Sequence, residues 1–171
     1  SQRGDPSVPF DFHTLKDAFI NGGWTPAING ARFAVCNPAD GEVIREVADC
    51  GEAETVAAVA AADAAQPGWA AKPAAERSAI LRRWRDLMVE HADALAALLT
   101  AENGKPLAEA KGEILYGASY LEWFAEEAKR LYGDVIPSGS PSNRILVIRQ
   151  PVGVCAAITP WNFPNAMLMR K

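Results

Sequence analysis

The side chains that could do chemistry lie near the carboxyl end of the chain, in residues 158–164 and at Arg170. Trp161 offers an apolar plate and Asn162 a neutral amide donor, and nearby prolines would hold both on a stiff support. The guanidinium of Arg170 can pair bidentately with a carboxylate. Along a helix that starts after Pro164, Arg170 lies two turns beyond Asn162, so both side chains could approach one pocket.

An apolar run at residues 152–157 precedes this segment and predicts a strand buried on both faces, as in a parallel sheet. Pro160 and Pro164 then forbid regular structure, so the strand should break into a rigid turn. Ligands bind at the carboxyl ends of strands in open α/β sheets. The sequence therefore predicts a binding site at this turn.

The elements before this strand are predicted from turn residues and from helical periodicity. Residues 19–24 should form a hairpin around Asn21-Gly22, and residues 43–47 should form another strand. Asp49 and Glu52 would make a capping box for a helix that Pro67-Gly68 ends. Four helical segments are predicted. The first spans residues 52–65, and the second runs from Pro73 past Met88. The third includes residues 95–99 and ends at Asn103-Gly104, and the fourth extends from near Pro106 to Gly133. The last of them would carry Leu121, Phe124, Ala128 and Leu131 on one face.

The composition is that of an ordinary globular protein. The chain has 171 residues, 49% hydrophobic and 22% charged, which is enough for one core. A net charge of −4 without a basic stripe argues against nucleic acid as a partner. The apolar stretches are far shorter than a membrane span, and residues 1–18 lack the pattern of a secretory signal. We therefore expect no membrane partner and a cytoplasmic location.

The cysteines and histidines give no sign of a disulfide framework or a metal site. Cys36, Cys50 and Cys155 are odd in number, widely spaced and without CxxC pairing. His13 and His91 stand alone, so no metal is predicted. Cys155 lies in the apolar run, where a buried thiol is inert, and it is not expected to act as a nucleophile.

Residues 158–164 resemble the aldehyde dehydrogenase superfamily, in which this string follows the first strand of the dinucleotide-binding sheet. Further matching motifs occur in the family's order and approximate spacing, at residues 37–41, 76–77, 80–81, 102–106, 132–133 and 150–154. The likeness runs from about Phe19 to Lys171. Within the superfamily, the chain most resembles succinate-semialdehyde dehydrogenases, through residues 104–114, 122–127 and 166–171.

The resemblance implies an α/β fold of which this chain is the amino-terminal part. Residues 1–136 would hold an amino-terminal arm, short β pieces and helices of the cofactor-binding domain. Residues 137–150 would be an oligomerisation-type β segment, with a strand at 144–149, and a homo-oligomer (dimer or tetramer) is expected. Residues 151–171 would form the first strand of a parallel Rossmann-type sheet and begin the next helix.

The catalytic domain, with its cysteine nucleophile and general-base glutamate, would lie outside this sequence. The 171 residues alone would then be inactive. The non-enzymatic alternative is a truncated piece that serves only in assembly or binding.

The resemblance also implies NAD or NADP as the cofactor. The cofactor would contact residues that line a wall beside its nicotinamide end, which are Ile158, Thr159, Pro160, Trp161 and Asn162. Asn162 would also be catalytic, because its amide N–H would stabilise the oxyanion that forms when a thiolate attacks the aldehyde. The alternative is that Asn162 only caps a turn.

Arg170 gives the expected substrate. By resemblance it would hold the distal carboxylate of succinic semialdehyde, which the intact enzyme would oxidise to succinate. Phe163 and Met167 would line the same channel, with core packing as their alternative role. A surface position for Arg170, and a dehydrogenase for a different aldehyde, remain the competing interpretations.

Overall fold

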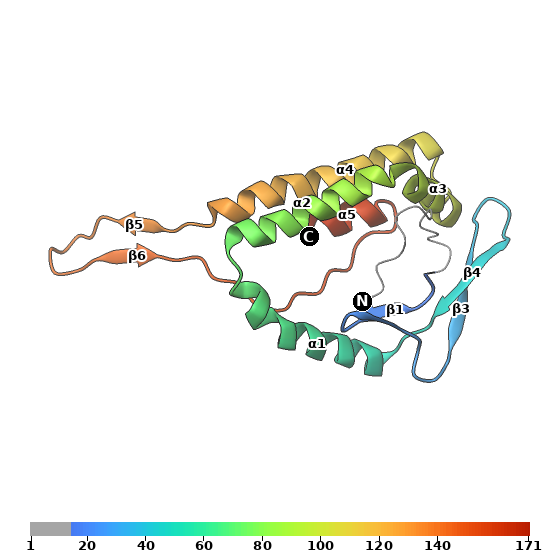
Figure 1. Ribbon diagram of the computed structural model, residues 1–171, viewed down its shortest axis with the longest axis horizontal. Helices are drawn as coiled ribbons and strands as arrows, with labels where there is room; N and C mark the ends of the chain where they lie inside the picture. The colour runs from blue at the N-terminus through green and yellow to red at the C-terminus, as the bar shows by residue number, and fades with distance from the viewer. Residues whose placement is uncertain (1–14) are drawn as a thin grey trace. The chain divides into compact units, whose positions relative to one another are not determined.

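The computed structural model describes residues 15–171, which form helices α1–α5, a short 3-10 helix η2 and three two-stranded antiparallel sheets (Figure 1). The chain divides into two compact units. The first comprises Ser1–Ala61, described from residue 15, with His91–Ile114; the second comprises Ala62–Glu90 with Leu115–Lys171. The predicted amino-terminal arm and His13 lie outside the described residues. Within residues 15–171, no helix has both the length and the apolar character needed to cross a membrane.

The first unit opens with the predicted hairpin, which is confirmed. Strands β1 (Ala18–Ile20) and β2 (Gly23–Thr25) are antiparallel. Asn21 and Gly22 join them with φ values of 51° and 79°, the positive values that a two-residue hairpin turn requires.

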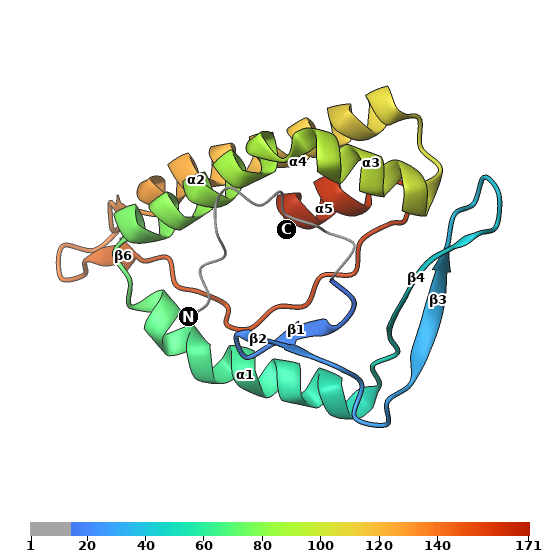
Figure 2. The ribbon, with the colours of Figure 1, turned by 45° about the vertical axis from the view of Figure 1, so that its right-hand side comes forward.

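A second hairpin of the first unit pairs β3 (Arg32–Cys36) with β4 (Val43–Ala48), and both views show the two strands side by side (Figure 2). Strand β4 confirms the prediction for residues 43–47. Strand β3 was not predicted, although turn residues bound it on both sides. Its short run offers too little alternation to reveal a strand without its partner.

The first turn of α1 (Glu52–Ala70) is closed by the buried side chain of Glu54. Its carboxylate accepts hydrogen bonds from the backbone N–H of Gly51 at 2.8 Å and of Ile28 at 2.6 Å. Because Gly51 directly precedes the helix, Glu54 satisfies an N–H at the helix start and ties the loop at Ile28 to it.

The predicted capping box of Asp49 and Glu52 is therefore wrong. In a capping box the side chain of Glu52 would accept from the backbone N–H of Asp49, but this N–H is bonded to the carbonyl of Ala31. The helix starts at Glu52, directly after Gly51. The predicted end before Pro67 is also wrong, since α1 continues to Ala70. A proline removes its own N–H bond, but its carbonyl still accepts from a later residue, here from the N–H of Ala71.

Glu54→Gln should lower the free energy of unfolding at neutral pH, and the loss should shrink as the pH falls. The two N–H donors hold the pKa of the Glu54 carboxyl below its ordinary value of 4.5. A group whose pKa is lower in the folded state stabilises the fold above the unfolded pKa, and this contribution disappears as the pH falls through the folded pKa. Urea unfolding between pH 7 and about pH 3 measures it.

Glu52→Gln is the matched control, because Glu52 lies in the same first turn. The control should show a smaller loss of stability at neutral pH. An equal loss for both variants, or a pH-independent loss for Glu54→Gln, would contradict the capping role.

Helix α3 (Ala92–Asn103) ends as predicted at Asn103-Gly104. Gly104 takes a left-handed conformation with φ of 79°, and its N–H bonds to the carbonyl of Thr100. Helix α4 (Leu107–Glu127) follows and contributes residues to both units.

The carboxyl end of α4 differs from the prediction. The helix tightens into η2 (Ala128–Arg130), which breaks the 3.6-residue period. Leu121 is buried as expected, whereas Phe124 and Leu131 are exposed. In the second unit the buried face of α4 is formed by Ala118, Leu121 and Ala125.

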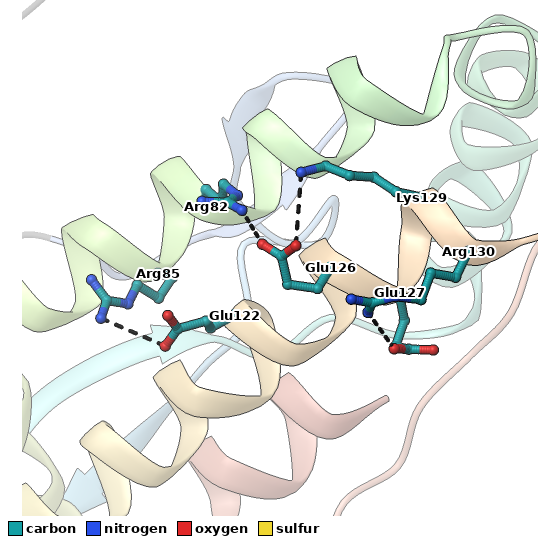
Figure 3. Close-up of polar contacts among 7 residues, drawn as sticks. All are labelled: Arg82, Arg85, Glu122, Glu126, Glu127, Lys129 and Arg130. Atoms are coloured by element: carbon teal, nitrogen blue, oxygen red, sulfur yellow. Dashed lines mark hydrogen bonds and ion pairs between the residues drawn. The ribbon is translucent and has the colours of Figure 1, made fainter.

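Helix α2 (Ala74–Glu90) confirms the helix predicted after Pro73, and ion pairs link it to α4 (Figure 3). Arg82 pairs with Glu126, and Arg85 pairs with Glu122 at 3.6 Å. Lys129 adds a second contact to Glu126 at 3.8 Å. Each exposed pair contributes little stability, but together they favour one rotation of α4 against α2.

The last hairpin pairs β5 (Asp134–Ile136) with β6 (Ile145–Val147). Strand β6 lies within the predicted strand at 144–149, whereas β5 was not predicted. All six strand residues are exposed.

The strand predicted for residues 152–157 is absent, and residues 148–160 have no regular structure. Val152 is 93% exposed and Ile158 is 99% exposed, so the predicted burial is also wrong. A parallel strand exists only through hydrogen bonds to its neighbours, and among the described residues no strand pairs in parallel. The apolar run lacks the partners that would order it.

Candidate active site

The predicted turn leads directly into α5 (Pro164–Arg170). Pro164 occupies the first turn of this helix, where its missing N–H costs no hydrogen bond. Trp161 and Asn162 lie in the turn before the helix and are exposed, with Trp161 at 80%. The predicted break and the helix after it are therefore confirmed, although the strand before them does not form.

Helix α5 places the predicted substrate residues on the second unit. Ala166 and Met169 are buried, Met167 is half-buried, and Arg170 is exposed at the end of the helix. Phe163, at the position that caps the helix start, is 42% exposed. The buried pair defines the face of α5 that packs inward. Arg170 lies four residues after Ala166, near this face, and is exposed as the last residue of the helix.

Gly117 of α4 lets three helices approach closely in the second unit. A Cβ atom at this buried position would overlap Oδ1 of Asn165, and it would lie 3.2 Å from Cγ of Met169. It would also lie 3.4 Å from Cε of Met88 in α2. The absence of a side chain at Gly117 thus leaves room for the side chains of Asn165 and Met169 of α5 against α4.

Gly117→Ala should destabilise the protein by about 1–3 kcal/mol, the usual cost of overpacking. Gly112→Ala is the matched control on the same helix, because a Cβ at Gly112 meets nothing within 4 Å. Alanine should stabilise the helix there by up to about 1 kcal/mol. Urea unfolding of the two variants should therefore give changes of opposite sign. Equal stabilisation by both substitutions would contradict the close approach at Gly117.

Arg170 lies against Tyr120 of α4, which in turn contacts Tyr116. Its Cζ atom is over the ring of Tyr120, 5.6 Å from the ring centroid. The hydroxyl groups of Tyr120 and Tyr116 are hydrogen-bonded, and the ring centroids are 4.7 Å apart. Neither tyrosine was predicted as a site residue. Their spacing places them on one face of a helix, but that face cannot be matched to α5 without the structure.

The neighbours of Tyr120 affect the ionisation of its hydroxyl group. The hydrogen bond to Tyr116 raises the pKa of the Tyr120 hydroxyl above its ordinary value of 10.0, and desolvation acts in the same direction. Arg170 opposes this rise in pKa but does not reverse it. Tyr120 therefore stays a neutral phenol at physiological pH.

Cys155 is exposed, so its predicted burial is wrong. The exposure of Cys155 follows from the missing strand, because the thiol was expected inside a covered sheet.

A cavity of about 350 Å³ in the second unit is lined by Ala62, Ala65, Gln66, Trp69, Val154 and Cys155. None of the predicted site residues lines this cavity. Within residues 15–171, no group of three or more His, Cys, Asp or Glu side chains is placed to hold a metal ion.

Known proteins resemble this chain closely over most of its length. A family model described as the aldehyde dehydrogenase family matches residues 24–171. A glutarate-semialdehyde dehydrogenase of Pseudomonas putida is 62% identical over 156 residues, which are 91% of this chain and 32% of the relative. A succinate-semialdehyde dehydrogenase [NADP(+)] of Escherichia coli is 57% identical, with the same coverage of both chains.

The fold is also found among solved structures. A succinate-semialdehyde dehydrogenase from Burkholderia pseudomallei superimposes with a TM-score of 0.91 at 55% identity, covering 94% of this chain and 34% of that chain. The chain thus spans about a third of the length of the relatives that it matches.

Proposed function

The chain belongs to the aldehyde dehydrogenase family, and we propose that it forms part of an enzyme that oxidises aldehydes carrying a distal carboxylate. The substrate class includes succinic and glutaric semialdehyde, which differ by one methylene. The names of the two curated relatives support this class, because both semialdehydes keep a carboxylate at the far end. NAD or NADP accepts the hydride.

The observation that carries this proposal is the position of Arg170. It is exposed at the end of α5, and no carboxylate of the described residues forms an ion pair with it. A guanidinium without a protein carboxylate is suited to bind one from a ligand, in the bidentate geometry that distinguishes arginine from lysine.

Residues 158–162 form the proposed contact surface for the cofactor. They comprise the end of an irregular segment and the start of the turn after it, and Ile158 and Trp161 expose most of their apolar surface. Such a surface fits the flat, partly apolar nicotinamide end of a dinucleotide. The side chains of Ile158 and Trp161 would exclude water from one side of the reacting carbon.

Asn162 is the proposed catalytic residue of this chain. When a thiolate adds to an aldehyde carbonyl, the oxygen gains negative charge. An amide N–H aimed at that oxygen stabilises the charge as it develops. Asn162 stands in the turn before α5, and Arg170 ends the same helix, so one rigid element would carry both groups.

A substrate series in the complete enzyme tests the proposed class. The specificity constant kcat/KM should be at least about tenfold higher for succinic semialdehyde than for butyraldehyde, which has the same length without the charge. Glutaric semialdehyde and pentanal form a second matched pair. If the uncharged aldehyde is used as well as the acid in both pairs, the distal carboxylate is not recognised and the proposal fails.

A further inference from the structure

We propose that Tyr120 is a positioning residue that holds the guanidinium of Arg170 in the orientation that receives the distal carboxylate of the substrate. This inference rests on the proposed function and adds a specificity-determining residue from another helix. It accounts for how an exposed arginine at the end of a short helix could keep a defined orientation.

The side chains of Arg170 and Tyr120 are in contact. A guanidinium within about 6 Å of an aromatic centroid is attracted to the negative face of the ring. The Cζ atom of Arg170 is 5.6 Å from the centroid of Tyr120 and lies over the ring. Arginine loses several freely rotating torsions when it is fixed, so a ring that restricts it beforehand lowers the entropic cost of binding a ligand.

The ring of Tyr120 is itself supported by neighbouring residues. Tyr116 lies one helical turn before Tyr120, and the two hydroxyl groups are hydrogen-bonded. The contacts around Gly117 hold α5 close to the same stretch of α4, with Met169 packed beside Gly117 and Arg170 next in sequence. Backbone packing and side-chain contact therefore both bring Arg170 to Tyr120.

Donors on Arg170 remain available for a ligand. A guanidinium carries five N–H donors, so contact with the single side chain of Tyr120 leaves donors free for a carboxylate. The raised pKa of Tyr120 keeps the phenol neutral, so it does not repel an approaching anion. The cluster thus presents one positive charge with directed donors, as recognition of a carboxylate requires.

Tyr120→Leu and Tyr120→Phe in the complete enzyme test this role. Leucine removes the ring, so KM for succinic semialdehyde should rise roughly threefold to tenfold, while KM for butyraldehyde should stay unchanged. Phenylalanine keeps the ring face and should leave both KM values within about twofold of the unmodified enzyme. The value of kcat for butyraldehyde should not change in either variant.

Tyr132→Leu is the matched control, because Tyr132 is 71% exposed and lies outside the cluster. It should leave the ratio of the two KM values unchanged. In an enzyme that already carries Arg170→Leu, adding Tyr120→Leu should cause no further loss for the acid substrate, since the ring acts through Arg170.

The outcomes separate this inference from the proposed function. If Arg170→Leu changes the ratio of KM values but Tyr120→Leu does not, the positioning role of Tyr120 is overturned and the substrate class stands. If Tyr120→Leu impairs both substrates equally, its role is structural and the inference is overturned. If Arg170→Leu itself leaves the ratio unchanged, both proposals are overturned.

Discussion

Replacing Arg170 with leucine in the complete enzyme should raise KM for succinic semialdehyde far more than KM for butyraldehyde. Breaking a desolvated charge pair costs about 2–5 kcal/mol, much of it the penalty on the carboxylate left unpaired. The specificity constant for the acid should therefore fall at least about tenfold. Steady-state kinetics with both aldehydes measures the difference directly.

Arg170→Lys is the informative companion variant. Lysine keeps the positive charge but loses the planar, bidentate donor pair and the contact of the guanidinium with the ring of Tyr120. It should recover only part of the lost specificity. Equal losses on the acid and neutral aldehydes with leucine would show that Arg170 supports the fold, and the proposed substrate class would then be wrong.

Asn162→Ala should lower kcat of the complete enzyme by about a hundredfold or more. The loss of one oxyanion donor typically costs about 10²–10³-fold, because the donor acts on charge that grows only in the transition state. The affinity for the cofactor should change little, since the amide side chain is proposed to act on the substrate oxygen. Single-turnover rates and cofactor titration separate the two effects.

Asn165→Ala, on the first turn of α5, is a useful comparison for Asn162→Ala. It alters the packing near Gly117 without removing the proposed oxyanion donor. If Asn162→Ala leaves kcat near normal, Asn162 is a turn residue and the proposed catalytic role is wrong.

Local signals in the sequence were sufficient for several elements. Asn21-Gly22 determined a hairpin because both residues accept positive φ values, and Gly104 ended α3 for the same reason. The family resemblance identified the fold, and the superposition on a solved relative confirms it. At the hairpin turn and at the end of α3, a few residues favour one local conformation, which is why these two features could be predicted.

Other features depended on partners that the sequence does not display. The run at 152–157 is apolar enough for a buried strand, but burial needs neighbouring strands, and Cys155 is consequently exposed. The contact between Tyr120 and Arg170 depends on the packing of α5 against α4 near Gly117, and the sequence does not display that packing. The roles of Asn162 and Arg170 came from resemblance, and they stay predictions.

The central claim is that Arg170 holds the distal carboxylate of the substrate. A crystal structure of the complete enzyme with bound glutarate, an unreactive dicarboxylate, tests it most directly. We predict that one carboxylate lies within hydrogen-bonding distance of the Arg170 guanidinium, at about 2.7–2.9 Å, with the ring of Tyr120 still against the guanidinium face. Glutarate bound in the active site with both carboxylates away from Arg170 would contradict the account.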